Sequence, residues 1–332
     1  MRIAKDSARL PNTGWIGRIG GVAALAVALA IAASPAAAVA KKKHQATNAF
    51  AGTGVVDATE APAAACGATF SSCCTISSGG MYTMSANIST AITSGTCVSI
   101  STSNVTINMA GFTITDTKSG NTAAGISMTG ATNDYLEGAN GTVTGFATGV
   151  SVNPGSSFGT RNAYVDSVNV TSNTAAGIHA AGNNVSISSI SAGSNLNGVE
   201  FDVCAGCSLN FGDIENNTAY GIWVNDSTNT AIGGIFTASN TSAGIYVGCN
   251  STPGSGSCGG THGNNTKIFN GLTDSNTYGV YIEEGETANN VAYTDGSSNT
   301  TDDAFARNDA TCSNTNWFEN VFGTASPACI PL

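Results

Sequence analysis

The sequence predicts an all-β solenoid, in which short strands stack turn upon turn, and three observations lead to this fold class. A four-residue phrase of Gly, Ile or Val, a variable residue and usually another apolar residue occurs seven times. A second phrase that begins with Asn follows it at several places, and a third short apolar segment then precedes a polar stop. Each phrase alternates in polarity with period two, which is typical of strands.

The glycine phrases recur at intervals of 21 to 35 residues, which indicates a solenoid period with insertions. In each copy the Ile or Val and the later apolar residue face one side, while the variable residue faces the other. The seven copies are Gly125-Ile126-Ser127-Met128, Gly149-Val150-Ser151-Val152, Gly177-Ile178-His179-Ala180, Gly198-Val199-Glu200-Phe201, Gly221-Ile222-Trp223-Val224, Gly244-Ile245-Tyr246-Val247 and Gly279-Val280-Tyr281-Ile282.

Two further short strands complete each repeat. Three strands without an intervening helix, and with Asn or Gly at the corners, describe one rung of a parallel β-helix. A leucine-rich repeat would need regularly spaced leucines, and this chain has very few. The abundant Ser, Thr and Asn side chains are expected to form ladders on the outside of the stack. The second strands begin at Asn104, Asn162, Asn184, Asn229 and Asn265, and third strands are expected at residues 189–191, 213–215, 234–236 and 271–273.

From about residue 66 to residue 329, the sequence resembles the right-handed parallel β-helix superfamily, which includes pectate lyases and polygalacturonases. Residues 80–85 and 104–114 resemble the start of such helices. We expect about nine rungs of three short strands between Cys97 and Phe322, followed by closing rungs. The resemblance implies no single activity, because proteins with this fold catalyse many different reactions and some are not catalytic at all.

Residues 1–40 are predicted to be a secretory signal peptide. Four basic residues precede an apolar run over residues 20–33, and Pro35 and small residues follow it. A membrane anchor is the alternative, but the run is shorter than the ~20 apolar residues that a spanning helix needs. Cleavage after Ala38 or Ala40 is expected to release a secreted, periplasmic or cell-surface protein without a membrane span.

The mature chain is expected to have three parts: a flexible linker at 41–65, an N-terminal cap at 66–96 and the β-helix at 97–332. Without residues 1–40 it holds seven Lys or Arg and twenty Asp or Glu, which gives a net charge of −13. This acidity argues against nucleic acid as a partner. We expect a monomer whose partner is a polysaccharide or a cell-envelope glycan.

All ten cysteines lie beyond residue 40, and an even number in an exported chain predicts disulfides. Cys204 and Cys207 also have the spacing of a redox motif, but such motifs begin a helix in an α/β unit. A zinc site fits poorly, because the N-terminal cysteines lack paired two-residue gaps. Local pairing predicts Cys204 with Cys207, Cys249 with Cys258, Cys312 with Cys329, and two bridges among Cys66, Cys73, Cys74 and Cys97.

Stacking predicts a candidate site on one outer face of the solenoid. Equivalent positions on successive rungs lie about 4.8 Å apart, so the variable residues of the glycine phrases form one outward row. That row is predicted to expose, after Ser127 and Ser151, the side chains of His179, Glu200, Trp223, Tyr246 and Tyr281. Asp202 faces the same side two residues after Glu200, and Asn225 lies on the next rung.

Glu200 and Asp202 would be a carboxylate pair roughly 7 Å apart, which suits acid and base roles in glycoside hydrolysis. His179 would hydrogen-bond to this pair or share the base role. Exposed Trp223, Tyr246 and Tyr281 would offer flat apolar surfaces to sugar rings. The alternative is that these aromatic side chains stack along the ladder and only stabilise it.

Longer intervals place loops at one edge of this face, and we expect Arg161 and His262 to contact substrate there. Lyase chemistry would need a base and a cation that neutralises a uronate carboxyl group. Lys118, Arg161, Lys267 and Arg307 are the few basic residues within the solenoid.

Motifs of particular enzyme families are mostly missing. Polygalacturonases carry Asn-x-Asp, Asp-Asp, Gly-His-Gly and Arg-x-Lys in that order, whereas here Asp302-Asp303 follows His262 and the solenoid lacks Arg-x-Lys. The epimerase signature Tyr-Gly-x-Asp-Pro-His is absent too. Two interpretations therefore stay open. The first is a protein that binds a polysaccharide, with or without cleaving it as a divergent lyase or glycoside hydrolase, and the second is a non-catalytic surface or adhesion protein.

Calcium is the one cofactor that the sequence suggests. Glu283, Glu284 and Glu286 are carboxylates of the kind that Ca²⁺ prefers. Adjacent carboxylates in one loop point in different directions, however, and are more typical of a solvated tip. No other metal site is predicted.

Overall fold

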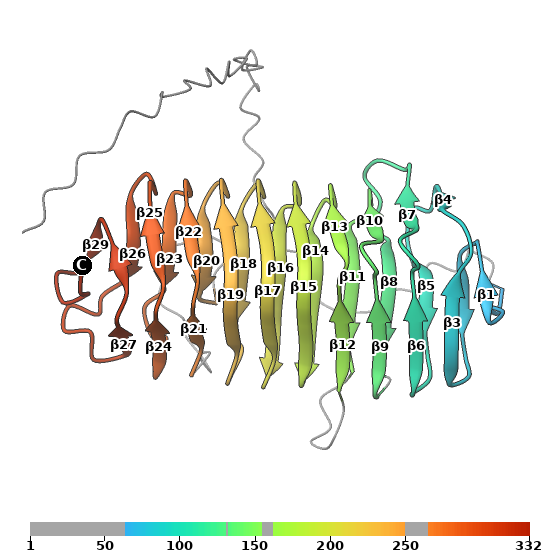
Figure 1. Ribbon diagram of the computed structural model, residues 1–332, viewed down its shortest axis with the longest axis horizontal. Coiled ribbons are helices and arrows are strands. Elements are labelled where there is room, and N and C mark those ends of the chain that lie inside the picture. Colours follow the sequence, from blue (N-terminus) through green and yellow to red (C-terminus); the bar gives the residue numbers. More distant parts are fainter. Residues whose placement is uncertain (1–63, 131, 155–161, 250–264) are drawn as a thin grey trace, which may run out of the picture. The chain divides into compact units, whose positions relative to one another are not determined.

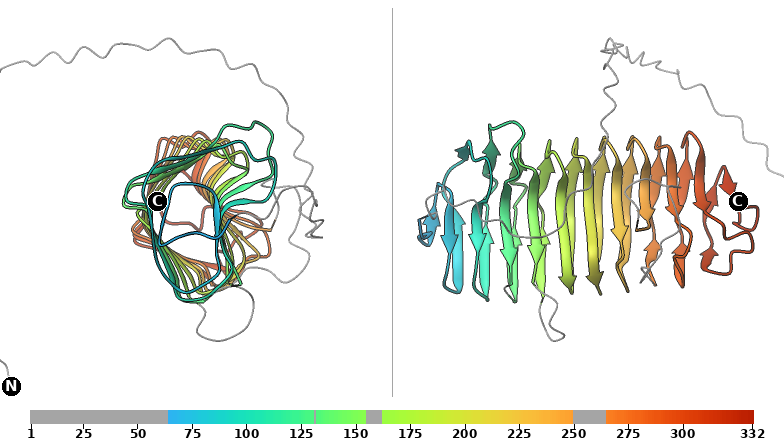
Figure 2. Two further views of the ribbon diagram at one scale, coloured as in Figure 1. Left: turned by 90° about the vertical axis from the view of Figure 1, so that its right-hand side faces the viewer. Right: turned by 180° about the vertical axis from the view of Figure 1, so that it is seen from behind.

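The structure, a computed structural model, describes residues 64–130, 132–154, 162–249 and 265–332. Every regular element in these ranges is a β-strand, from β1 (Thr69–Phe70) to β29 (Ala325–Ser326). The strands stack turn upon turn along one axis (Figure 1), and the turns overlie one another when viewed along it (Figure 2). The predicted signal peptide, and the predicted linker up to residue 63, lie outside the described residues.

One sheet, here sheet A, takes a single strand from each turn and carries the glycine phrases. Its 11 strands pair in parallel with partners one turn away. The nine strands from β5 to β26 confirm the predicted number of rungs between Cys97 and Phe322. The strands are β2 (Cys74–Ile76), β5 (Thr96–Ile100), β8 (Ala124–Thr129), β11 (Thr148–Asn153), β14 (Ala176–Asn183), β16 (Asn197–Ala205), β18 (Tyr220–Asn225), β20 (Ala243–Val247), β23 (Tyr278–Ile282), β26 (Asp302–Ala306) and β29.

The second sheet, sheet B, takes two segments from most turns, so that each turn has three strand segments, as predicted. In three central turns the two segments merge into the long strands β15, β17 and β19. Its 18 strands are β1, β3 (Gly80–Met84), β4 (Ile88–Thr90), β6 (Val105–Asn108), β7 (Thr113–Asp116), β9 (Asp134–Glu137), β10 (Thr142–Thr144), β12 (Ala163–Asp166), β13 (Asn169–Thr171), β15 (Val185–Gly193), β17 (Ser208–Glu215), β19 (Ala231–Ala238), β21 (Lys267–Phe269), β22 (Leu272–Asp274), β24 (Asn289–Ala292), β25 (Asp295–Ser297), β27 (Thr315–Phe318) and β28 (Val321–Phe322).

A buried ladder of asparagines runs beside the apolar core, just before the strands of sheet A. Asn195 donates from its main-chain N and from Nδ2 to Oδ1 of Asn217, at 3.0 and 3.2 Å. The prediction that polar side chains form ladders on the outside misses this interior one, where the amides satisfy main-chain groups of the buried turn. The ladder comprises Asn173, Asn195, Asn217, Asn240, Asn276 and Asn299.

This ladder explains why the repeated phrase begins with glycine. A Cβ atom on Gly198 would lie 2.6 Å from the carbonyl oxygen of Gly221 and 2.9 Å from Nδ2 of Asn217. Gly221 meets the next amide in the same way, with Nδ2 of Asn240 at 2.8 Å. The turn therefore excludes any side chain at the glycine, while the Ile or Val that follows is fully buried, as at Val199.

The structure confirms that the cysteines in its described ranges are disulfide-bonded. Cys249 is also disulfide-bonded, but Cys258, its predicted partner, lies outside the described residues. Bridges of this kind are typical of oxidising compartments. The described pairs are Cys66–Cys74, Cys73–Cys97, Cys204–Cys207 and Cys312–Cys329.

In the ranges that the structure describes, no helix is long and apolar enough to span a bilayer.

Candidate functional site

The parallel register of sheet A aligns the predicted row. It pairs His179 on β14 with Glu200 on β16, and Glu200 with Trp223 on β18. Trp223 pairs in turn with Tyr246 on β20, and Tyr246 with Tyr281 on β23. Stacking thus brings together side chains that are far apart in the sequence, while Ser127 and Ser151 continue the row on β8 and β11.

Three titratable side chains meet on β14 and β16. Nε2 of His179 lies 3.6 Å from Oδ2 of Asp202, and both side chains are about one-third exposed, at 31% and 35%. Asn225 donates from Nδ2 to Oδ1 of Asp202 at 2.7 Å, and Asn197 donates to Oε2 of Glu200 at 3.3 Å. Neutral amides therefore hold both carboxylates from the side while the outer face stays open to solvent.

The three groups shift each other's pKa values in different directions. Burial raises the pKa of Glu200, and the nearby His179 charge only partly offsets this. The polar contact with His179 lowers the pKa of Asp202. Burial acts to lower the pKa of His179, but the contact with Asp202 and the two carboxylate charges outweigh it and raise the pKa. The surroundings thus move the pKa values of the two carboxyl groups apart, upward for Glu200 and downward for Asp202.

The aromatic part of the row is less open than the sequence predicts. Trp223 is half-buried and donates from Nε1 to the carbonyl oxygen of Gly248 at 2.7 Å. Tyr246 and Tyr281 keep the predicted register but are buried, with exposed fractions of 0% and 3%. The prediction of three exposed aromatic residues therefore holds in part for Trp223 and is corrected for the two tyrosines.

Neighbouring rings bury these tyrosines. Tyr220 stacks on Tyr246 with ring centroids 4.8 Å apart, and Tyr278 meets Tyr281 edge-on at 5.0 Å. Tyr220 and Tyr278 directly precede the glycines of their phrases, where most other copies have a small residue. Our sequence reasoning missed both, although an aromatic residue before the glycine was the available signal.

An ion pair lies next to the cluster of aromatic rings formed by Tyr220, Tyr246, Tyr278 and Tyr281. Arg307 follows β26 and donates from Nη1 to Oε1 of Glu283 at 2.7 Å, and Tyr246 donates its hydroxyl proton to Oε2 at 3.1 Å. Glu283 is 1% exposed, so the prediction that the acidic residues at 283, 284 and 286 form a solvated tip is wrong at this position. Burial and the Glu283 charge raise the pKa of Tyr246 and keep its hydroxyl protonated.

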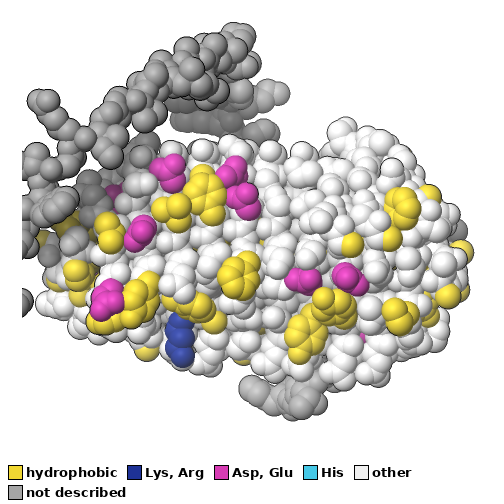
Figure 3. Space-filling view, viewed as in Figure 1, with side chains coloured by type: hydrophobic (Ala, Val, Ile, Leu, Met, Phe, Trp, Pro, Cys, Tyr) yellow, Lys and Arg dark blue, Asp and Glu magenta, His cyan; other side chains and the backbone are white. Residues whose placement is uncertain are grey.

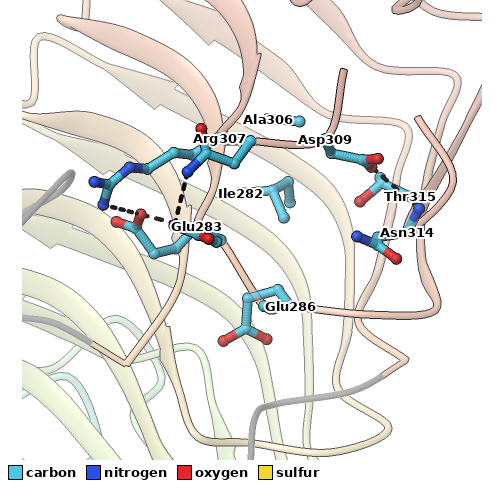
Figure 4. Close-up of a pocket in the computed structure, with 11 residues that line it drawn as sticks. Ile282, Glu283, Glu286, Ala306, Arg307, Asp309, Asn314 and Thr315 are labelled. Carbon is cyan, nitrogen blue, oxygen red and sulfur yellow. Dashed lines mark hydrogen bonds and ion pairs between the residues drawn. The ribbon is translucent and has the colours of Figure 1, made fainter. Parts of the chain in front are cut away.

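Beside this pair lies a cavity of about 270 Å³, lined by residues 282–286, 306–309 and 314–315 (Figure 4). The Glu283 carboxylate points toward Arg307, whereas the Glu286 carboxylate points away from Asp309 and Asn314. In the described part of the chain, no three acidic, His or Cys side chains are grouped so that they could hold a metal ion. The residues at 283, 284 and 286 therefore do not fit the suggested calcium site.

Arg161 and His262, the predicted edge residues, lie outside the described residues. The other predicted site residues belong to described strands of sheet A. The structure therefore brings His179, Glu200 and Asp202 together beside Trp223 on sheet A, where the repeat spacing predicts them.

No protein-family model matches this chain, and no curated protein sequence matches it. Among solved structures, the A-module of a mannuronan C-5 epimerase of Azotobacter vinelandii aligns with a TM-score of 0.57 at 17% identity, over 73% of this chain and 67% of that chain. The Dettilon tailspike protein aligns with a TM-score of 0.55 at 12% identity, over 76% of this chain and 51% of that chain. The fold is that of the right-handed parallel β-helix proteins.

The parallel β-helix fold is all that these identities show. The chain spans about half the length of the tailspike that it matches. An activity must accordingly be argued from the residues on the solenoid and from their chemistry.

Proposed function

We propose that the protein binds a polysaccharide across the outer face of sheet A and cleaves a glycosidic bond there. The observation that carries the proposal is the grouping of His179, Glu200 and Asp202 beside Trp223. A protonated and an ionised carboxyl group on one open face are the pair that glycoside cleavage requires. In this reading Glu200 is the acid, Asp202 is the base and His179 holds Asp202 in place.

Two further features support this assignment. The half-buried Trp223 provides an apolar ring next to Glu200, and aromatic faces suit the C–H faces of sugars. One structural neighbour is named as an epimerase of mannuronan, itself a polysaccharide. The disulfides fit an exported protein, and we propose that residues 1–40 direct that export.

The test is incubation of the mature protein with a panel of neutral and uronate-containing polysaccharides. New reducing ends measure hydrolysis, and the absorbance of unsaturated uronates measures lyase chemistry. Glu200→Gln and Asp202→Asn should each lower the rate by at least about 100-fold, as expected for loss of acid or base catalysis. Ser127→Ala, in the same row two strands from His179, is the matched control and should retain the rate.

The result also decides between the two interpretations of the sequence. Binding that weakens in Trp223→Ala, without new chain ends, would leave a binding module. The absence of both binding and cleavage would favour a structural or adhesion protein, in which the rigid rod is itself the function.

A further inference from the structure

A second open surface lies on sheet B, around β9, β12, β15 and β17. Figure 3 views this side of the molecule and shows hydrophobic side chains in separate groups, with acidic side chains beside some of them and very few basic ones. One groove there, of about 600 Å³, is lined by Asn162, Tyr164, Asn184, Ser186 and Ser208 among others. Its volume is within the range of small-ligand sites.

Small residues create this groove. The register pairs Tyr164 with Ser186, and Ser186 with Ser208, so two short side chains follow the ring along the stack. Tyr135 packs against the ring from the preceding turn, with centroids 6.2 Å apart. The ring of Tyr164 is therefore supported on one flank and open on the other, and the residue is 40% exposed.

An interrupted column of amides forms the adjoining wall. Asn162 and Asn184 stand just before β12 and β15, and the equivalent position before β17 is Gly206, which has no side chain. Elsewhere in this column the amides bond to each other, as Asn265 does to Asn229 at 2.7 Å. Gly206 offers no side chain to the amide of Asn184, whose Oδ1 lies 2.8 Å from the position that a Cβ atom would take at Gly206, and both residues line the groove.

We propose that this groove binds a segment of a neutral oligosaccharide. A supported aromatic ring bordered by amides and hydroxyls matches a sugar, which has an apolar C–H face and a rim of hydroxyl groups. Of the described residues that line the groove, none is charged. Glu137 and Asp166 lie two residues beyond Tyr135 and Tyr164 on the same strands, and their charges disfavour an anionic glycan.

A peptide fits this surface less well. Extended peptides bind by adding a strand to an exposed sheet edge, but β12 is already paired with β9 on one side and with β15 on the other. The groove offers side chains rather than main-chain groups, and this favours a carbohydrate. The proposal does not depend on the sheet A site, which lies on other strands and has charged groups.

The test is affinity electrophoresis in gels that contain dextran, starch, glucomannan, galactomannan or xyloglucan. Trp223→Ala serves as the background, so that the sheet A face does not contribute. We expect retardation in at least one gel and a loss of affinity of about five- to tenfold on adding Tyr164→Ala. Tyr164→Phe keeps the ring and should stay within about twofold, and unchanged thermal unfolding would show that the variants are folded.

Two results would overturn the proposal: no retardation in any of the five gels, whether or not alginate or pectate gels run in parallel retard the protein, and retardation that Tyr164→Ala leaves unchanged. The single variant Tyr164→Ala, which keeps Trp223, is also assayed for polysaccharide cleavage. This assay tests whether the groove acts independently of the sheet A site. Cleavage that persists while gel retardation is lost supports a second site. Loss of cleavage together with retardation overturns the independence of the groove.

Discussion

Glu283 and Glu286 lie three residues apart and are both buried, yet their surroundings differ. Glu283 is paired with Arg307 and accepts the Tyr246 hydroxyl. Glu286 is 2% exposed, and neither of its carboxylate oxygens has a hydrogen-bond partner among the residues that the structure describes. Burial, together with the charges of Asp226 and Glu283, raises the pKa of Glu286 to about 8.

This difference predicts how stability depends on pH. The folded state holds the Glu286 proton more tightly than the unfolded chain, whose carboxyl titrates near 4.5. The contribution of the protonated Glu286 side chain to the stability of the folded state is therefore fully present below pH 4.5 and is lost as the pH rises through about 8. Glu286→Gln should be more stable than the wild type at pH 9 by roughly 5 kcal/mol and nearly equal to it at pH 4, measured by denaturant unfolding.

The control for this measurement is Glu284→Gln, since Glu284 accepts a hydrogen bond from Asn308 at 2.8 Å and is half-buried. The fall in stability toward pH 9 should persist in this variant, because Glu286 is unchanged. Asp134, whose pKa burial raises to about 6, should leave a smaller slope in every variant. Equal pH profiles for Glu286→Gln and the wild type would contradict the assignment.

The candidate acid and base predict a second pH effect. Activity needs Asp202 ionised and Glu200 protonated, and their pKa values are moved apart, downward for Asp202 and upward for Glu200. The rate should therefore fall on both sides of an acidic window between these two pKa values. His179→Gln removes the cation that lowers the Asp202 pKa. The fall in rate at the acidic side of the pH profile should therefore shift to higher pH. A fall that stays at the same pH would show that His179 does not act on Asp202.

At the scale of one element, the six sheet A strands β11, β14, β16, β18, β20 and β23 have as their second residue a glycine whose Cβ position lies against an amide of the asparagine ladder. Gly198→Ala would place Cβ 2.5 Å from Cγ2 of Ile214 and 2.6 Å from the carbonyl oxygen of Gly221. We expect a loss of at least about 2 kcal/mol in the free energy of unfolding, because a rigid main-chain atom cannot move aside. Gly212→Ala on β17 is the matched control.

In that control the added Cβ meets only side chains, at 3.5 Å, and the change should stay within about 0.5 kcal/mol. Denaturant unfolding at one pH compares the two variants. Similar stabilities would mean that the turn relaxes around a methyl group, and the steric account of the glycine phrase would fail.

Residue spacing predicted the strands and their alignment because the register of a stack follows directly from the period. It could not predict which outward residues stay open. Burial of Tyr246 depends on Tyr220, which lies before the glycine and on the preceding turn, so the covering ring belongs to a different phrase. The Glu283–Arg307 pair joins residues 24 positions apart, and charge spacing within one loop gives no sign of it.

At the scale of the whole molecule, the described disulfides differ in how much chain they close. Cys73–Cys97 spans 24 residues near the N-terminal end of the solenoid, whereas Cys204–Cys207 spans 3 in the middle. In the chain-entropy account, a larger loop restricts the unfolded state more. Replacing Cys73 and Cys97 by Ala should therefore cost about 1.5 kcal/mol more than replacing Cys204 and Cys207.

Equilibrium unfolding of the two double variants under oxidising conditions measures this difference. Because turns contact only their neighbours, hydrogen exchange should also show faster opening of β2 and β5 in the first variant, with β14 to β18 little changed. A larger loss from the central pair would contradict this prediction.

The asparagine ladder has a consequence for how the length of this protein can change. Each amide receives bonds from the preceding turn and gives the same bonds to the next, so Asn195, Asn217 and Asn240 have interchangeable surroundings. A duplicated gene segment that encodes the 22 residues from one ladder position to the next would insert a turn whose buried amide already has both partners. Selection can thus lengthen or shorten the rod by whole turns without inventing a new core.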